Sequence, residues 1–178
     1  GIQDNELIYA MGREIGRQCN LLGIHVNFAP VVDINNNPNN PVINYRSFGE
    51  RKQNVAEKGW AYAKGMQDKK VMACAKHFPG HGDTDVDSHK DLPVINHTRK
   101  RLDTMEMYPF KYLIDSGVHS VMTAHLYIPA IDKRKNMAIS VSDKAINGIL
   151  RKEMGFKGLA FTDALNMQGV AKFHEAGD

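Results

Sequence analysis

The sequence predicts an α/β protein that forms part of a (β/α)8 TIM-type barrel. Apolar runs alternate with segments of helical periodicity along the 178 residues in the order α-β-α-β-α-β-α-β-α, which is typical of a parallel sheet with right-handed crossovers. Long loops follow the strands, and this favours a barrel over an open doubly wound sheet, because a barrel builds its active face from such loops. Only four strands are recognisable where a barrel needs eight. We therefore expect about four βα units, incomplete at both ends, in a single domain spanning residues 1–178.

The individual elements follow from hydrophobic periodicity and from the residues that interrupt it. Helical spacing of apolar residues predicts helices over 5–22, 51–69, 98–116 and 145–154, and a last one that begins near Asn166. Short apolar runs predict strands over 24–29, 71–75, 118–124 and 159–162. Pro109 predicts a kink or a split in the third helix, since proline removes a backbone donor. Gly117 is placed to end that helix.

The segment 31–50 is rich in Asn and Pro and predicts a long irregular loop. A loop of this length inside a compact domain is usually functional. Within it, Arg46 has two interpretations that local context leaves equally good. Its guanidinium stacks on Tyr45 at the surface, or it forms a fork aimed at the hydroxyls or carboxylate of a ligand.

Composition argues against several classes of partner. The formal charge is +3, and the basic residues are spread along the chain, so we expect no nucleic-acid partner and no binding to an anionic membrane. No apolar run approaches the roughly 20 residues that a membrane-spanning helix needs. The two cysteines, Cys19 and Cys74, form neither a metal-binding nor a disulfide framework.

The stretch 76–89 concentrates the titratable groups of the chain. It holds three histidines, three carboxylates and a lysine just past a predicted strand, which is where α/β enzymes keep their chemistry. Asp87 and His89 are two residues apart, a spacing that lets a carboxylate fix one imidazole nitrogen while the other faces a substrate. The same spacing is also typical of an ordinary hydrogen bond within a loop.

Asp163 stands at the end of the last predicted strand, where a carboxylate can be a nucleophile, a metal ligand or a helix cap. Metal binding is the main alternative for the 76–89 stretch, which has enough donors for zinc or a dinuclear centre. However, Pro79 and Gly80 prevent His77 and His81 from sharing a helical face, and the carboxylates follow no recognised ligand spacing. We expect no metal and no other cofactor.

Taken together, three segments resemble the family 3 glycoside hydrolases, and most closely their bacterial β-N-acetylglucosaminidase branch. These are residues 76–82 (KHFPGHG), 87–89 (DSH) and 161–167 (FTDALNM). Residues 27–33 (NFAPVVD) and 46–49 (RSFG) are similar to the same family, in the same order. The resemblance covers essentially the whole chain.

The resemblance implies a (β/α)8-type barrel and a retaining mechanism. It implies that Asp163 is the nucleophile and forms a covalent glycosyl-enzyme intermediate. His89 would be the general acid/base, with Asp87 as its partner, in place of the second carboxylate of most glycosidases. Lys76, His77 and Arg46 match positions that bind sugar hydroxyls.

The implied function is an exo-β-N-acetylglucosaminidase of the bacterial cytoplasm or periplasm, acting on peptidoglycan fragments or chitooligosaccharides. The alternatives are a β-glucosidase-type member, a metal-dependent barrel hydrolase and a catalytically dead carbohydrate-binding scaffold. The β-glucosidases of the family lack the Asp87–His89 element, and its presence here favours the N-acetylglucosaminidase.

The sequence departs from the family in two ways. A further sugar-binding Asp of the early strands has no counterpart, and the chain stops shortly after Asp163. We therefore expect the remainder of the barrel to be a partner of these residues. We also expect the segment alone to be unstable or inactive, because an incomplete barrel exposes unpaired edges.

Overall fold

In the computed structural model, residues 3–84 and 92–173 are described. The helices and strands follow one another as α1 (Asn5–Leu21), β1 (Val26–Asn27), η1 (Asn44–Arg46), α2 (Lys52–Gln67), β2 (Met72–Phe78), α3 (Arg99–Thr104), α4 (Tyr108–Ser116), β3 (Ser120–Thr123), η2 (Ile139–Val141), η3 (Lys144–Glu153), β4 (Leu159–Thr162) and α5 (Gln168–Ala171). Every predicted helix and strand has a counterpart among them.

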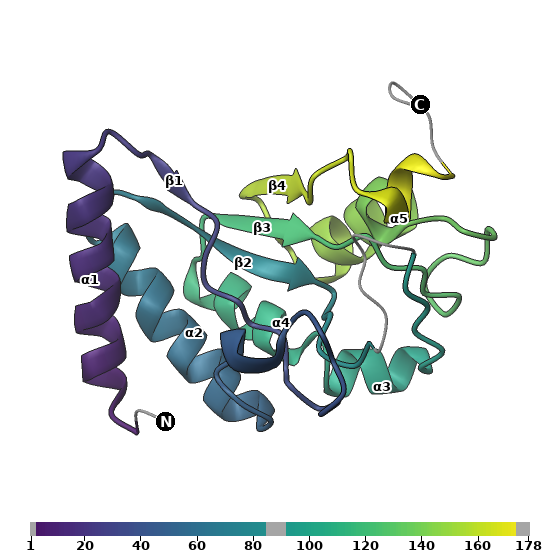
Figure 1. The fold of residues 1–178 in the computed structure, drawn as a ribbon, viewed down its shortest axis with the longest axis horizontal. Coiled ribbons are helices and arrows are strands. Elements are labelled where there is room, and N and C mark those ends of the chain that lie inside the picture. Colours follow the sequence, from purple (N-terminus) through teal and green to yellow (C-terminus); the bar gives the residue numbers. More distant parts are fainter. Residues whose placement is uncertain (1–2, 85–91, 174–178) are drawn as a thin grey trace.

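The strands of the described residues form one parallel sheet in the order β1-β2-β3-β4. The order follows the chain, as in a barrel, and the four strands all point in the same direction (Figure 1). The register aligns Lys76 of β2 with Met122 of β3, and Met122 with Phe161 of β4. Side chains that follow these positions are therefore brought to the same rim.

Helices α1, α2 and α4 lie side by side on one side of the sheet (Figure 1). Two glycines let α1 and α2 touch backbone to backbone. A Cβ atom on Gly12 would lie 2.3 Å from the carbonyl oxygen of Tyr62, and one on Gly65 would lie 2.3 Å from that of Tyr9. Since van der Waals contact between such atoms needs more than 3 Å, any larger residue at either position would push the two helices apart.

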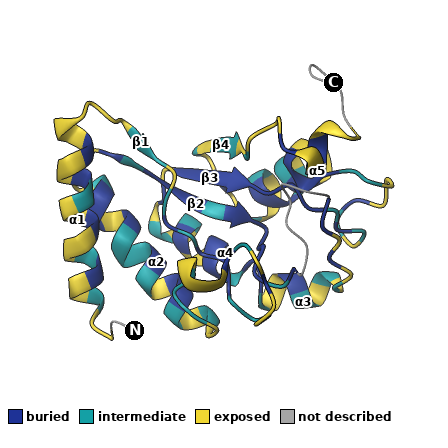
Figure 2. Ribbon diagram, in the orientation of Figure 1, coloured by how far each residue is buried: buried dark blue, intermediate teal, exposed yellow. Residues whose placement is uncertain are grey.

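The core fills the space between the sheet and these helices, and β2 and β3 are the most deeply buried strands (Figure 2). Phe78 of β2 packs edge-to-face on Phe110 of α4, with ring centroids 5.5 Å apart. Both side chains are fully buried, and burial on this scale stabilises a fold by about 2 kcal/mol for each ring. In contrast, Leu159 of β4 is 53% exposed.

The predicted third helix is split, as Pro109 indicated. α3 ends at Thr104, α4 begins at Tyr108, and Pro109 occupies the first turn of α4, where no N–H donor is required. Gly117 ends α4 in the left-handed conformation with φ of 101°, which glycine adopts without steric cost.

Two predicted strands and one predicted helix also differ from the structure in their bounds or geometry. The strand predicted over 24–29 is reduced to Val26–Asn27, because Ala29 turns back to donate to the carbonyl of Asn27 and Pro30 offers no N–H. The strand predicted over 71–75 runs on to Phe78, because Val32 and Ala124 donate to the carbonyls of Lys76 and Phe78. The helix predicted over 145–154 has π-type hydrogen bonding.

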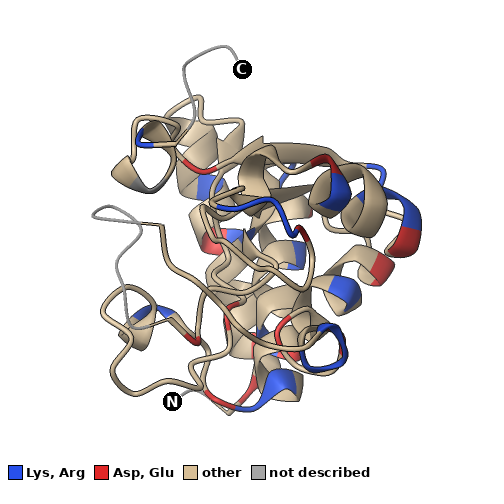
Figure 3. Ribbon diagram, turned by 90° about the vertical axis from the view of Figure 1, so that its right-hand side faces the viewer, with Lys and Arg blue, Asp and Glu red and all other residues tan. Residues whose placement is uncertain are grey.

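In the view onto the end of the sheet, Lys and Arg lie interspersed with Asp and Glu on several elements of the described chain (Figure 3). In the part of the chain that the structure describes, no helix combines the length and the apolar character that crossing a membrane requires.

Candidate active site

A cavity of about 190 Å³ lies at the carboxyl ends of β2, β3 and β4. Four of the six predicted site residues line it, namely Arg46, Lys76, His77 and Asp163. The rest of its lining is His81 and an apolar set made of Phe28, Val42, Met122 and Met167. The two other predicted residues, Asp87 and His89, lie outside the described residues.

Lys76 is the half-buried cation of this cavity. Burial is the main cause that lowers the pKa of its ammonium group, and the nearby charge of Arg46 lowers the pKa further. The carboxylates of Asp163 and Asp33 act in the opposite direction. The peptide bond between Lys76 and His77 is cis. The cavity thus combines two cations with the carboxylate at the end of β4.

Asp163 directly follows β4 and is held there by its backbone. Its N–H donates to the carbonyl of Thr123 at 3.0 Å, and its Oδ1 accepts from the N–H of Ala164 at 2.8 Å. The next helix, α5, begins at Gln168 and has Met167 as its N-cap. Asp163 is therefore not a helix cap, and the carboxylate lines the cavity instead.

His77 is oriented by Asp33, a residue to which the sequence analysis gave no role. Asp33 is fully buried, and its carboxylate accepts from the backbone N–H of His77 at 3.1 Å and from that of His81 at 2.7 Å. The Nδ1 atom of His77 lies 2.7 Å from Asp33 Oδ2. Because Asp33 engages Nδ1, the other ring nitrogen is left for the cavity that His77 lines.

The pKa of the Asp33 carboxyl is held below its usual range. Burial alone would raise the pKa, and it is the largest influence. The charge on His77 and its hydrogen bond outweigh burial, with help from the charge and the backbone N–H of His81. Asp33 is therefore an ionised, buried anchor beneath the cavity.

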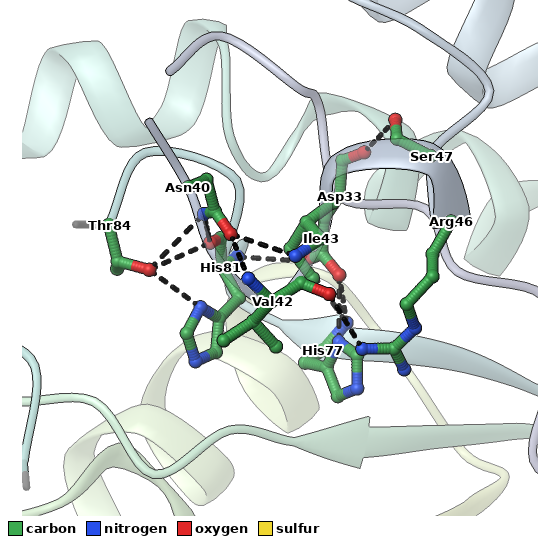
Figure 4. A network of polar contacts seen from close by, with 9 residues as sticks. All are labelled: Asp33, Asn40, Val42, Ile43, Arg46, Ser47, His77, His81 and Thr84. Atoms are coloured by element: carbon green, nitrogen blue, oxygen red, sulfur yellow. Dashed lines mark hydrogen bonds and ion pairs between the residues drawn. The ribbon is translucent and has the colours of Figure 1, made fainter. Parts of the chain in front are cut away.

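His81 and Asn40 connect the two loops of the site (Figure 4). Asn40 Nδ2 donates to the carbonyl of His81 at 2.8 Å, and its Oδ1 accepts from the N–H groups of Val42 and Ile43, both at 2.8 Å. His81 Nδ1 lies 2.9 Å from Thr84 Oγ1. Burial is the main cause that lowers the pKa of the His81 imidazole.

The position of Arg46 decides between its two interpretations. Its Nη1 donates to the carbonyl of Val42 at 3.1 Å, and the side chain lines the cavity. The ring of Tyr45 is 99% exposed, so it does not cover the guanidinium, and the surface-stacking interpretation is wrong. The loop 31–50 therefore delivers a cation to the site, as its length suggested.

Two other features of the described residues compete as candidate sites. Ligand atoms of Asp83, His97 and Glu106 lie within 4.8 Å of one another, but the guanidinium of Arg101 lies 3.0 Å from Glu106 and 4.0 Å from Asp83 and already supplies a cation. A hollow of about 590 Å³ lies on the outer faces of α1, α2 and α4, away from the strand ends. Neither has the converging donors of the cavity around Asp163.

Comparison with known proteins identifies the family. The sequence profile of the glycosyl hydrolase family 3 N-terminal domain matches residues 2–178. The chain belongs to glycosyl hydrolase family 3. The match confirms the family that the segments 76–82 and 161–167 indicated.

The chain is also similar to individual proteins, both in sequence and in structure. "Beta-hexosaminidase A" of Pseudoalteromonas piscicida is 42% identical over 183 residues, covering 96% of this chain and 31% of the relative. The structure of a family 3 beta-N-acetylglucosaminidase from Paenibacillus sp. str. FPU-7 is 47% identical with a TM-score of 0.94, covering 96% of this chain and 32% of that one. A beta-glucoside phosphorylase, BglX, is 28% identical with a TM-score of 0.91, covering 95% and 32%.

These family 3 comparisons bear on the fold and on the length of the chain. The TM-score of 0.94 confirms the predicted partial barrel. The chain spans about a third of the length of the three relatives named above.

Proposed function

We propose that this family 3 chain carries the active site of a retaining exo-β-N-acetylglucosaminidase. The observation that carries the proposal is the shared cavity of Asp163, Lys76, His77 and Arg46 at the strand ends. The printed names of the relatives, beta-hexosaminidase and beta-N-acetylglucosaminidase, supply the reaction class. The substrate is then a terminal β-linked N-acetylglucosamine, on a peptidoglycan fragment or a chitooligosaccharide.

Asp163 is the nucleophile in this proposal. Its carboxylate attacks the anomeric carbon, the bond to the leaving oxygen breaks, and a covalent glycosyl-enzyme forms. Water then attacks the same carbon and releases the sugar with its configuration retained. The cations Lys76 and Arg46 line the same cavity as this carboxylate.

Asp87 and His89 are assigned from the sequence alone, since they lie outside the described residues. His89 gives its proton to the leaving oxygen in the first step and takes one from water in the second. Asp87 accepts from the other ring nitrogen of His89 and fixes its tautomer.

Lys76, Arg46 and His77 hold the sugar ring through its hydroxyl groups. The charged donors, Lys76 and Arg46, make stronger hydrogen bonds than neutral ones, and donors aimed at the ring hydroxyls stabilise the oxocarbenium-like state as it develops. The anchor Asp33 fixes His77 for this role. Residues 1–178 form a segment of one barrel domain in this proposal, and the remainder of the barrel completes it.

The proposal is tested by trapping the intermediate in the protein at its natural length. A fluorinated N-acetylglucosamine donor is added, and the adduct is located by peptide mass spectrometry. We expect the sugar on the peptide that contains Asp163. Asp163→Asn should abolish the adduct and nearly all turnover, whereas Asp115→Asn on the outer helix α4 should change neither. An adduct on another residue, or normal turnover by Asp163→Asn, would overturn the assignment.

The role of His89 is tested separately with two leaving groups. His89→Ala should lose much less activity on a substrate with an activated leaving group than on a natural disaccharide, because protonation then matters less. Equal losses on both substrates would count against His89 as the acid.

The relation to a beta-glucoside phosphorylase supports a second candidate function. In that case inorganic phosphate, rather than water, attacks the glycosyl-enzyme. Product analysis with and without phosphate separates the two, because a phosphorylase releases a glycosyl phosphate. Comparison of N-acetylglucosamine and glucose donors also tests the β-glucosidase-type alternative.

A further inference from the structure

His125 is a fully buried histidine that the proposed function leaves without a role. It lies two residues beyond the end of β3, and its side chain is 1% exposed. Its Nδ1 lies 2.7 Å from Ser140 Oγ, and its Nε2 lies 2.9 Å from the carbonyl oxygen of Ala164. The ring therefore connects the segment after β3 with η2 and with the segment after β4.

The partners of the ring determine which nitrogen carries a hydrogen. The carbonyl oxygen of Ala164 can only accept, so Nε2 must be protonated to make its hydrogen bond. In the neutral ring Nδ1 is then an acceptor, and the hydroxyl of Ser140 donates to it. Ser140 is 2% exposed, so water does not compete readily for this bond. Ser140 thus selects the tautomer that holds Ala164.

Ala164 is also the residue that contacts the carboxylate of Asp163. Its N–H donates to Asp163 Oδ1 at 2.8 Å, while its carbonyl accepts from His125 Nε2 at 2.9 Å and from the N–H of Met167 at 3.1 Å. On the other side, the N–H of Asp163 donates to the carbonyl of Thr123. Two residues at the end of β3, Thr123 and His125, therefore fix the backbone before and after the carboxylate.

We propose that His125 is a positioning residue for the nucleophile and that Ser140, His125 and Ala164 form a brace behind Asp163. This inference rests on the proposed function, because it takes Asp163 as the nucleophile. None of the three residues of the brace lines the cavity. It acts on the geometry of attack, where a misplacement of about 1 Å costs on the order of 100-fold in rate.

Three variants of the protein at its natural length test the brace. His125→Leu keeps most of the volume and removes the donor, and we expect kcat to fall by about 10- to 100-fold while KM stays within about threefold. His125→Gln retains an amide N–H near the position of Nε2 and should recover most of the lost kcat. His119→Gln, at the other end of β3, is the matched control and should leave kcat unchanged.

Two further measurements complete the test. They are the rate at which the fluorinated donor labels the protein and the melting temperature of each variant. We expect His125→Leu to slow labelling of Asp163 by the same factor as kcat, with a melting temperature close to that of His125→Gln. If kcat and the labelling rate are unchanged, or if His125→Gln is as impaired as His125→Leu, the brace is wrong. A rise in KM in step with the fall in kcat would indicate a merely structural residue and would also overturn it.

The outcome also separates this inference from the proposed function. If the wild-type adduct lies on Asp163 and labelling is equally fast in His125→Leu, only the brace fails. If the wild-type adduct lies on a different residue, the assignment of the nucleophile fails and the brace falls with it.

Discussion

Asp33 and Asp132 are both fully buried carboxylates, and they accept hydrogen bonds from different kinds of groups. Asp33 accepts from two backbone N–H groups and faces the ring of His77. Asp132 accepts from the guanidinium of Arg134 at 2.6 Å and from the hydroxyl of Ser142 at 2.7 Å. The anchor beside the cavity is thus paired with histidines, and the remote one with an arginine, which is a permanent cation.

The different partners of Asp33 and Asp132 indicate different roles for the two carboxylates. Hydrogen bonding with Arg134 is the largest influence on the Asp132 carboxyl and holds its pKa far below the usual range, although burial opposes it. This arrangement stabilises the loop after β3 and orients no cavity residue. Asp33 instead fixes the ring of His77, which lines the cavity. We expect loss of Asp33 to affect both stability and turnover, and loss of Asp132 to affect stability alone.

Between the two buried carboxylates, the larger effect is expected from Asp33→Asn. The asparagine amide places an N–H against groups that already donate, and it removes the charge that faces His77. Breaking a buried pair of this kind costs about 3 kcal/mol of unfolding free energy, and kcat/KM should fall more than tenfold because His77 is released. Urea denaturation and steady-state kinetics measure the two losses. Wild-type kcat/KM in this variant would show that Asp33 does not orient His77.

Asp132→Asn is the matched control, with the same substitution at an equally buried position. We expect a smaller loss of unfolding free energy, because Arg134 is 53% exposed and regains water when the carboxylate is removed. Its kcat should stay within about twofold of the wild type, since no cavity residue contacts Asp132. A loss of kcat as large as that of Asp33→Asn would remove the distinction between the two carboxylates.

The pH dependence of stability sharpens the comparison. Both carboxyls have pKa values below the usual range, so each stabilises the fold above about pH 4 and loses that contribution as the pH falls through its folded pKa. The His81 imidazole, which faces Asp33, His77 and Asp163, also has a lowered pKa. As the pH falls, His81 therefore becomes protonated in the unfolded chain at a higher pH than in the folded one. The free energy of unfolding should thus already decline below about pH 6.5.

Urea denaturation between pH 8 and pH 5 checks this decline. His81→Gln should remove the component near pH 6.5, and Asp132→Asn should retain it. An identical pH profile for wild type and His81→Gln would contradict the expected contribution of His81.

The smallest expected effect comes from Arg134→Lys. Lysine keeps the charge but loses the planar fork that reaches both oxygens of Asp132. We expect a drop in melting temperature smaller than that of Asp132→Asn, with unchanged kcat. A drop as large as that of Asp132→Asn would mean that the fork geometry, rather than charge, dominates this pair.

The sequence predicted those elements whose bounds depend on nearby residues. Pro109 and Gly117 gave the split and the end of the third helix, and β4 has the predicted bounds, 159–162. The strand over 24–29 was predicted too long, because its pairing depends on a turn at Ala29 and on β2 rather than on its own apolar residues. The strand predicted over 71–75 was too short, because its extension to Phe78 depends on hydrogen bonds from Val32 and Ala124, which lie on other segments.

The site could be predicted only in part. Asp163, Lys76, His77 and Arg46 were found because the motifs that contain them resemble a family, and the structure brings them to one cavity. Asp33 was quoted within one of those motifs but received no role, since its partner His77 lies 44 positions further along the chain. Asn40 could not be singled out from the sequence, because it is one of several asparagines in the same loop and only its contacts in the folded chain, with His81, Val42 and Ile43, distinguish it.

The backbone contact between α1 and α2 has a consequence for how the sequence can vary. At Gly12 and Gly65 the neighbouring helix occupies the space that any other side chain would need. In a survey of all single substitutions, these two positions should be as intolerant as Asp163 although they lie far from the cavity. A second survey scored on the amount of folded protein would separate them, because the glycines would remain intolerant while substitutions of Asp163 would be accepted. Positions on the outer helices that tolerate no substitution are therefore needed for the helices to pack together, and not for catalysis.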